Sequence, residues 1–325
     1  MSRPFKWIVA FIALVLVFSA FAGNWAASMS LHPARRPLSG DLIAQADKVF
    51  QRDRAERVPF DVRAQDGNLL RGWLVDSIEG SLSESFSHGA NNNERRDWVL
   101  LFHGVADNRV GDLGVADFLL RAGYGVVMMD SRAHGESEGD TATFGWKERD
   151  DVRAIVATLE SNVHPRCIFA FGVSMGAGIA LQAAAAEPRI AGVAAEAPFT
   201  NFREASYDYA GFHKNPWLGR ILFRPVVEAG FLFTKKIAGF YPSDVSPEKS
   251  VAEHPFPVLL ISDGDDVVLP LRHQQAIFVA ATGPKELWIV PGAGHASAMG
   301  VAPEEYERRV LSFFAKAQDN CSTTR

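Results

Sequence analysis

Residues 169–178 read FAFGVSMGAG, an apolar run followed by a serine between two glycines and then by an alanine-rich segment. The apolar run is typical of a buried strand, and the alanine-rich segment is typical of a helix. Ser174 therefore stands at the turn between a predicted strand and a predicted helix. The five residues GVSMG match the pattern G-x-S-x-G, in which a sharp strand-to-helix turn exposes a nucleophilic serine.

The residues around Ser174 suit this turn. Gly172 and Gly176 allow neighbouring chain to pass where a side chain would clash. The predicted helix points its first backbone amides toward the serine. Acyl transfer needs such donors for the developing oxyanion, and the N–H of Met175 is the first candidate. Five residues with three fixed recur by chance, so this pattern needs support from the rest of the chain.

The chain around Ser174 alternates between strand-like runs and segments with helical spacing. Strand-like runs lie within residues 98–104, 123–135, 166–176, 190–199, 257–263 and 285–290. Helical spacing occurs in residues 111–123, 148–160 and 303–317. Short buried strands that alternate with helices predict an α/β fold, with a mainly parallel sheet covered on both faces.

Three further segments complete the predicted organisation. Residues 58–75 indicate two strands around a turn at Asp66 and Gly67. Residues 77–97 are polar and are predicted to form a surface loop. Residues 199–254 are too long for one crossover and are predicted to form a helical insertion over the edge where the strands end. Additional core helices are the alternative interpretation of this segment. If it roofs a pocket at Ser174, the apolar residues expected to line the wall include Trp217, Leu218, Ile221, Leu222, Phe231 and Phe233.

A serine hydroxyl becomes a good nucleophile only when a base takes its proton, and histidine is the usual base. Four histidines follow Ser174, and they are His213, His254, His273 and His295. His295, in PGAGHAS, directly follows the last predicted strand. Because catalytic groups collect at the carboxyl ends of strands in open α/β sheets, we expect His295 to be the base. His103 precedes Ser174, which is the wrong order for this fold.

The loop after residues 98–104 and the loop after PVLLIS supply the remaining candidates. His103 and Gly104 are expected to shape the first loop, and the N–H of Val105 is the second expected oxyanion donor. The second loop carries three candidates for the carboxylate that orients the base. These are Asp263, Asp265 and Asp266.

The motifs LFHG, DSRAHGESEG, GVSMGAG, SDGDDVVLP and GAGH occur in this order along residues 58–316. In these motifs the chain resembles the α/β-hydrolase superfamily, and most closely its bacterial serine aminopeptidase-like, lysophospholipase-like and dienelactone-hydrolase-like branch. The resemblance implies a Ser-His-Asp hydrolase without a cofactor, on an eight-stranded-type sheet with a cap inserted after the sixth strand. SDGDDVVLP resembles the family pattern H-G-x-x-D-x-V-V-P, which implies that Asp266 is the acid. Ser262 and Asp263 replace the usual His-Gly, and Asp265 stays an alternative.

The N-terminus carries Arg3 and Lys6 before an uncharged apolar run over residues 7–23. This pattern is typical of a secretory signal or a signal anchor. Ala20 and Ala22 offer a cleavage site, and the run is also near the length that spans a bilayer. The positive charges favour a cytoplasmic N-terminus, so the catalytic domain is expected outside the cytoplasm. It would be membrane-anchored, or secreted or periplasmic after cleavage.

The predicted domains are a signal peptide or anchor at residues 1–29, a linker at 30–57, the hydrolase domain at 58–316 with its insertion at 199–254, and a polar tail at 317–325. The 33 basic and 38 acidic residues form no basic stripe, so no nucleic-acid partner is expected. No spacing typical of a metal site appears. Cys167 is predicted to be a buried free thiol, and Cys321 lies in the tail.

The sequence therefore favours a serine hydrolase that cleaves a small-molecule carboxylic ester. Hydrolysis of an amide or peptide bond by the same triad is the first alternative. A membrane-tethered binding protein on an inactive hydrolase fold is the second alternative. A missing triad member would favour that reading, but a serine, a histidine and an acid are all present in the expected order.

Overall fold

The structure is a computed structural model that describes residues 3–77, 95–213 and 215–322. The predicted surface loop at residues 77–97 lies almost entirely outside these described residues. The last three residues of the predicted tail lie outside them as well.

An eight-stranded sheet forms the centre of the domain, in the order β1-β4-β6-β5-β7-β8-β9-β10. Strands β5 to β10 run parallel, whereas β4 pairs antiparallel with both β1 and β6. The mainly parallel sheet is therefore confirmed. The strands are β1 Ala55–Pro59, β4 Gly72–Ser77, β5 Asp97–Phe102, β6 Gly125–Met129, β7 Cys167–Val173, β8 Ile190–Glu196, β9 Val258–Asp263 and β10 Lys285–Val290.

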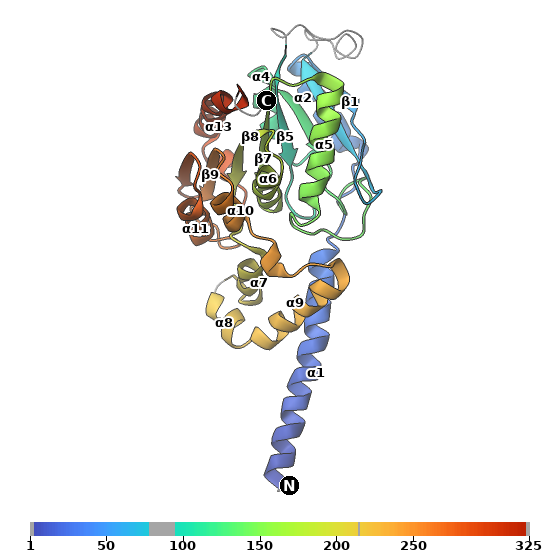
Figure 1. The fold of residues 1–325 in the computed structure, drawn as a ribbon, viewed down its shortest axis with the longest axis vertical. Coiled ribbons are helices and arrows are strands. Elements are labelled where there is room, and N and C mark those ends of the chain that lie inside the picture. Colours follow the sequence, from blue (N-terminus) through green and yellow to red (C-terminus); the bar gives the residue numbers. More distant parts are fainter. Residues whose placement is uncertain (1–2, 78–94, 214, 323–325) are drawn as a thin grey trace.

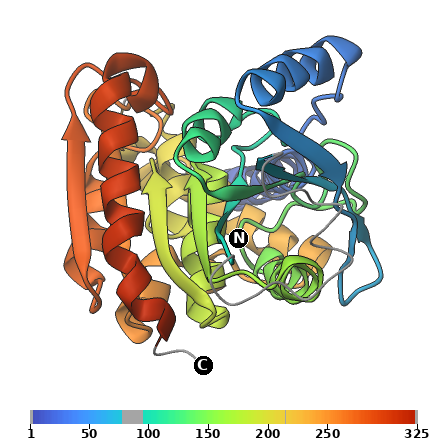
Figure 2. The same cartoon turned by 90° about the horizontal axis from the view of Figure 1, so that it is seen from above.

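Helices cover both faces of this sheet, because alternate strand residues point to opposite sides. Leu100 and Phe102 of β5 belong to one apolar core, and Val99 and Leu101 belong to the other. The first core is covered by α5 Glu148–Val163, α6 Met175–Ala186, α10 Pro247–Glu253 and α11 Arg272–Ala280. The second is covered by α2 Gly40–Arg52, α4 Leu113–Arg121 and α13 Pro303–Ala317. Figure 2 shows α13, in red, and α5, in green, beside the strands.

The predicted turn at Asp66 and Gly67 joins two short strands between β1 and β4. These are β2 Val62–Arg63 and β3 Leu69–Leu70, which pair antiparallel. Gly67 has a φ of +90°, a conformation that glycine adopts without strain.

The predicted linker at residues 30–57 includes an amphipathic segment, which the structure shows as helix α2 packed on the domain. Ser39 caps α2 by accepting a hydrogen bond from the Leu42 N–H, and α2 buries Ala46 and Phe50 against the second core. Arg35 donates to the carbonyl oxygens of Ser137 and Gly139. The segment is amphipathic, so its apolar face joins the domain core instead of staying in solvent.

Helix α1, Arg3–Leu31, is longer than the apolar run and projects from the domain at the carboxyl end of the strands. Its length and composition are sufficient to cross a membrane. One face is nevertheless buried, and it carries Ser19, Gly23, Ala27 and Leu31 at four-residue intervals. Leu31 packs with Phe199, Phe240 and Leu269, so the end of α1 belongs to the folded domain.

The insertion between β8 and β9 lies at the same end of the molecule as α1 (Figure 1). It contains α7 Phe202–Ala210, α8 Pro216–Ile221, α9 Arg224–Ala238, the 3-10 helix η2 Pro242–Asp244, and α10. Helix α9 packs along α1, whereas α10 packs on α6. The alternative interpretation as core helices therefore applies to α10, and α7 to α9 form the structure that protrudes from the domain.

The prediction of a free thiol at Cys167 is wrong, because Cys167 and Cys321 form a disulfide with a Cα–Cα distance of 5.5 Å. Cys167 begins β7, and Cys321 lies in the 3-10 helix η3 Gln318–Ser322 after α13. Helix α13 runs back along the sheet and places η3 beside the start of β7. The two cysteines are 154 residues apart in the sequence, so their contact could not be inferred from it. The bond fixes the described part of the predicted tail to the sheet.

Candidate active site

Ser174 lies on a strained turn between β7 and α6, with a φ of 54° and a ψ of −111°. Two glycines make this turn sterically feasible. A Cβ atom on Gly176 would lie 1.8 Å from the carbonyl oxygen of Phe102, and one on Gly172 would lie 2.3 Å from the backbone of Gly176. The turn therefore packs against the end of β5 in a way that no larger residue would allow.

A continuous chain of hydrogen bonds joins Ser174 to His295 and Asp266. The Oγ atom of Ser174 lies 2.9 Å from Nε2 of His295, and Nδ1 of His295 lies 2.7 Å from Oδ2 of Asp266. Because a carboxylate accepts but does not donate, Nδ1–H donates to Asp266 and Nε2 is left to accept the serine proton. Of the three predicted acids, Asp266 contacts the histidine, and the Asp265 side chain is exposed.

The backbone holds Asp266 in this position. Its Oδ1 atom accepts hydrogen bonds from the N–H groups of Val268 and Leu269, at 2.7 and 2.9 Å. Burial raises the pKa of Asp266, but its hydrogen bond to His295 and these backbone donors outweigh burial and lower it. The Asp266 side chain is therefore an anion that faces the imidazole.

Burial lowers the pKa of His295, but the hydrogen bond to Asp266 and its negative charge outweigh burial and raise it. The charges of Asp263 and Glu196 act in the same direction. These carboxylates stabilise the imidazolium that forms when His295 accepts a proton.

Two further buried acids lie behind the histidine, of which the sequence offered Asp263 as a candidate for the orienting acid and did not single out Glu196. Glu196 accepts a hydrogen bond from the hydroxyl of Tyr306 at 2.6 Å, and burial together with the charge of Asp263 raises its pKa to about 7. Asp263 accepts from the N–H of Ala296, which follows His295. Both acids end parallel strands, β8 and β9, and this position is the signal that could have identified them.

Asp263, Asp266 and His295 bring ligand-type atoms within 4.8 Å of one another. Such a cluster invites comparison with a metal site. Both oxygens of Asp266 and Nδ1 of His295 are already engaged in hydrogen bonds. The arrangement therefore suits proton transfer better than metal coordination.

The loop after β5 lies on the other side of Ser174. The N–H of Ser131 donates to Nε2 of His103 at 3.1 Å, so Nδ1–H of His103 donates to the Gly104 carbonyl at 2.7 Å. Burial and the neighbouring His134 lower the pKa of His103 to about 4. A neutral His103 thus shapes the loop. Val105 lines the pocket of Ser174, and Met175 begins α6.

The neighbouring loop after β6 is held by two buried ion pairs. Asp130 accepts hydrogen bonds from both the backbone N–H and the guanidinium of Arg109, at 2.7 and 2.6 Å. Arg132 donates to Asp151 at the start of α5. The first pair joins the loop after β5 to the loop after β6, and the second joins the loop after β6 to α5.

A pocket of about 380 Å³ contains Ser174 and His295. Asp107, Asp112 and Glu196 also line it, and none of its described lining residues is Lys or Arg. Asp112 is only 6% exposed and makes no side-chain hydrogen bond or ion pair with any residue that the structure describes. Burial and the charge of Asp107 raise its pKa to about 8.

The predicted apolar roof over this pocket is wrong. Among the described residues of the insertion, Tyr209 of α7 lines the pocket. Trp217 and Leu222 are exposed, and Phe231 packs with Tyr207 and Val227 inside the insertion. Helix α9 extends to α1, and α8 lies on the other side of the insertion, beside α7 (Figure 1).

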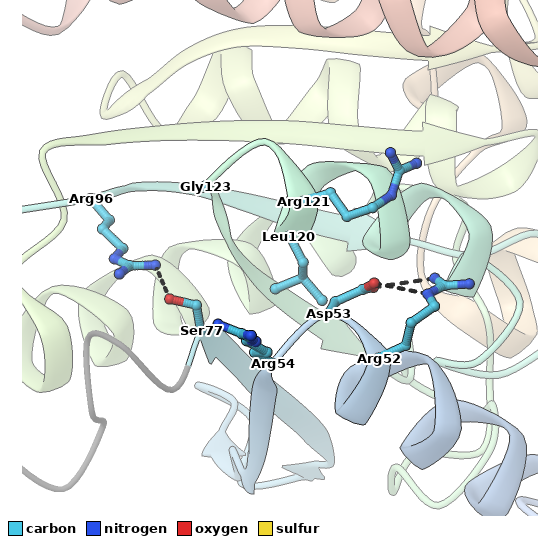
Figure 3. A pocket seen from close by; sticks show the side chains of 8 residues that line it. All are labelled: Arg52, Asp53, Arg54, Ser77, Arg96, Leu120, Arg121 and Gly123. Atoms are coloured by element: carbon cyan, nitrogen blue, oxygen red, sulfur yellow. Dashed lines mark hydrogen bonds and ion pairs between the residues drawn. The ribbon is translucent and has the colours of Figure 1, made fainter.

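A second cavity, of about 650 Å³, lies at the opposite end of the sheet (Figure 3). Four arginines line it, at positions 52, 54, 96 and 121. Arg96 pairs with Asp76, Arg52 with Asp53 and Arg121 with Glu307. The cavity adjoins the starts of β5 and β6, whereas Ser174 lies where the strands end, so the two are separate.

The other downstream histidines lie away from Ser174. His273 of α11 pairs with Asp208 of α7 at 2.7 Å, and both side chains are buried. His213 follows α7, and its ring contacts Tyr209. His254 ends α10. Of the four histidines after Ser174, the structure brings His295 to the serine hydroxyl.

Comparison with known proteins agrees with this fold. Residues 93–234 match the family described as serine aminopeptidase, S33. The chain is 28% identical to the Bacillus subtilis protein YqkD over 227 residues, which cover 68% of this chain and 72% of YqkD. It is 26% identical to the Danio rerio lysophosphatidylserine lipase ABHD12 over 198 residues, or 58% of this chain and 48% of that protein.

Among solved structures, the Pyrococcus furiosus esterase Pf2001 superposes with a TM-score of 0.66 and 23% identity, covering 89% of this chain and 97% of the esterase. This structural similarity agrees with the fold described above. The family match, the sequence relatives and the shared fold support a place for this chain in the α/β-hydrolase superfamily.

Proposed function

We propose that this hydrolase cleaves a carboxylic ester through an acyl-enzyme formed on Ser174. The observation that carries the proposal is the unbroken hydrogen-bonded chain from Asp266 through His295 to the serine hydroxyl. The esterase and lipase among the similar proteins support ester hydrolysis as the class of reaction.

The reaction begins when Oγ of Ser174 attacks the ester carbonyl and its proton moves to Nε2 of His295. The N–H groups of Met175 and Val105 stabilise the resulting oxyanion. His295 then gives its proton to the departing alkoxide. Water attacks the acyl-enzyme, with His295 again as base, and Asp266 stabilises the imidazolium in both halves.

A fluorophosphonate probe tests this proposal directly, because it labels only an activated serine. The full-length protein should be labelled, and Ser174→Ala should not be. Asp265→Asn is a matched control, since this exposed carboxylate does not contact His295. If Ser174→Ala still reacts at the wild-type rate, another nucleophile operates and the mechanism is wrong.

Hydrolysis of an amide or peptide bond is a second candidate, favoured by one observation. Asp112 is a buried carboxyl group without a partner among the described residues, in the same pocket as Ser174. Such a group suits a substrate that carries an ammonium group. Parallel assays of an aminoacyl amide and its ester would decide which bond the enzyme prefers.

We also propose that α1 stays attached as a membrane anchor, with the catalytic domain outside the cytoplasm. Cleavage after Ala22 would cut α1 in the middle of its buried face, between Ser19 and Gly23. The Cys167–Cys321 disulfide favours an oxidising compartment. Full-length protein should fractionate with membranes, whereas a mature chain beginning at Gly23 in mass spectrometry would contradict the anchor.

A further inference from the structure

Large apolar side chains are exposed on the insertion, at α8 and its two flanking turns. We call this surface the insertion face. It comprises Phe212, Trp217, Ile221 and Leu222, which are between 56% and 70% exposed. Trp217 and Ile221 are four residues apart on α8, and the ring of Phe212 contacts Phe223, which precedes α9. A contiguous exposed patch of this kind marks a surface that another apolar phase covers.

The insertion face is connected to α1 through α9. A Cβ atom on Gly23 would lie 2.6 Å from the backbone nitrogen of Gly230, so the backbones of α1 and α9 are in direct contact. Figure 1 shows that α9 runs from α8 to α1 at the end of the domain from which α1 projects, with α8 on the side of the insertion away from α1. The insertion face is therefore linked to the apolar helix through α9.

Two tryptophans on α1 indicate where a bilayer would lie. Trp7 and Trp25 are 76% and 62% exposed. At a helical rise of about 1.5 Å per residue they are about 27 Å apart, close to the thickness of a hydrocarbon core. Tryptophan is enriched at both membrane interfaces. Trp25 therefore marks the interface on the domain side, and Gly23, the contact residue for α9, lies beside it.

The charges of α8 and α9 fit the same location. Arg220, Arg224, Lys235 and Lys236 are exposed, and Glu228 is the acidic residue of the two helices. Basic residues on an amphipathic helix attract anionic lipid headgroups while the apolar side chains enter the boundary with the acyl chains.

We propose that the insertion face docks into the membrane interface that α1 enters, so that the protein contacts the bilayer at a second place besides its anchor. This inference rests on the proposed anchor and adds a defined surface to it. Tyr209 lines the pocket of Ser174, and Phe212 of the insertion face follows it by three residues. The docked surface thus adjoins the pocket, and an amphiphilic ester can reach Ser174 from the lipid.

A fluorescence experiment on the full-length protein tests the docking without an activity assay. A cysteine is introduced by Leu222→Cys and labelled with an environment-sensitive fluorophore. Labelling is done without reductant, because the disulfide protects Cys167 and Cys321. The matched control is Val279→Cys, since Val279 is 78% exposed near the end of α11. Both proteins are reconstituted into vesicles of anionic and zwitterionic lipids with brominated acyl chains.

The label at position 222 should shift to shorter wavelength and be quenched by the brominated chains, because it lies in the interface. The label at position 279 should remain unquenched. If the two labels behave alike, or if position 222 is unquenched while α1 is inserted, the insertion face does not dock and the proposal is overturned. Neither result depends on Ser174.

A second pair of variants tests the consequence for substrate supply. Leu222→Asp should lower turnover of a long-chain ester embedded in vesicles about tenfold, since burial of one leucine contributes about that factor. Turnover of a soluble acetyl ester should be unchanged, as should both activities of Val279→Asp. Equal effects of Leu222→Asp on the two esters would contradict lipid-side supply. Absence of all ester turnover in the wild type would instead contradict the proposed function.

Discussion

Within the described part of the chain, two histidine–aspartate pairs have the same separation and different surroundings. Nδ1 of His295 lies 2.7 Å from Asp266, and Nε2 of His273 lies 2.7 Å from Asp208. The first pair joins the loops after β9 and β10 at the pocket. The second joins α11 to α7 in a buried position.

The difference lies in the second ring nitrogen. Nδ1 of His273 accepts a hydrogen bond from the N–H of Thr200 at 3.1 Å, so both ring nitrogens are occupied by fixed partners. Nε2 of His295 faces the hydroxyl of Ser174 at a pocket. A carboxylate beside a histidine is therefore not sufficient for a base. The other ring nitrogen must also lie within hydrogen-bond distance of the hydroxyl whose proton it accepts.

The largest predicted effect is the difference in turnover between variants of His295 and His273. His295→Ala should lower turnover of a short-chain ester by roughly four to six orders of magnitude and leave the melting temperature nearly unchanged. His273→Ala should lower the melting temperature, with turnover of the folded protein kept within a few-fold. Calorimetry and steady-state kinetics measure both quantities. A comparable loss of turnover in His273→Ala, well below its melting temperature, would remove the distinction.

The two aspartates should separate in the same way. Asp266→Asn should lower turnover by roughly two to four orders of magnitude, because the histidine loses its orienting anion. Asp208→Asn should instead lower the free energy of unfolding by about 1–3 kcal/mol, since the buried carboxylate accepts from the buried His273 and from the partly exposed Arg272.

Asp265→Asn serves as the control for both measurements, because Asp265 is exposed and adjacent to Asp266 in the chain. It should change neither stability nor turnover appreciably. A larger loss of turnover in Asp265→Asn than in Asp266→Asn would move the acid by one residue.

The pH dependence of kcat/KM should sharpen the same comparison. His295 must be neutral to accept the serine proton, and its pKa is raised above the ordinary histidine value of about 6.5. Activity should therefore rise with pH through a midpoint above that value. Asp266→Asn removes the carboxylate that raises the pKa of His295, whereas burial still lowers it. The midpoint of the pH profile of this variant should therefore shift to lower pH. An unchanged midpoint in this variant would mean that His295 does not set the acidic limb.

The sequence was informative wherever a single position follows a predicted strand. Ser174 and His295 lie directly after strands, and their places in the fold follow from the common carboxyl edge of a parallel sheet. The choice of Asp266 over Asp265 as the acid needed the family resemblance. Both residues follow the same predicted strand, so the strand pattern alone does not distinguish them. The hydrogen bonds from Val268 and Leu269 that orient Asp266 arise only in the folded loop.

Features that depend on distant packing could not be predicted. The partner of Cys167 is brought back by α13, and the exposed side of α8 depends on how α9 meets α1. Trp217 and Leu222 were expected to line the pocket because apolar residues usually face a protein interior. Hydrophobicity alone does not distinguish a pocket wall from a surface that faces lipid.

The smallest predicted effect concerns the carboxyl group of Asp112, which pairs with no histidine among the described residues. It lines the pocket with Ser174 and is buried, and burial with the charge of Asp107 raises its pKa to about 8. An ammonium group on the substrate would pair with its ionised form. Asp112→Asn should lower kcat/KM for an ammonium-bearing ester about fivefold relative to a neutral ester of the same shape. One partly screened ion pair contributes about this factor. Asp107→Asn is the control, since Asp107 already pairs with Arg36 at 2.6 Å and should have a smaller effect on this ratio.

In the wild type the preference for the cationic ester should increase as pH rises through about 8, because Asp112 then loses its proton. A ratio that changes neither with Asp112→Asn nor with pH would show that Asp112 does not recognise the substrate, and the amide candidate would lose its supporting observation.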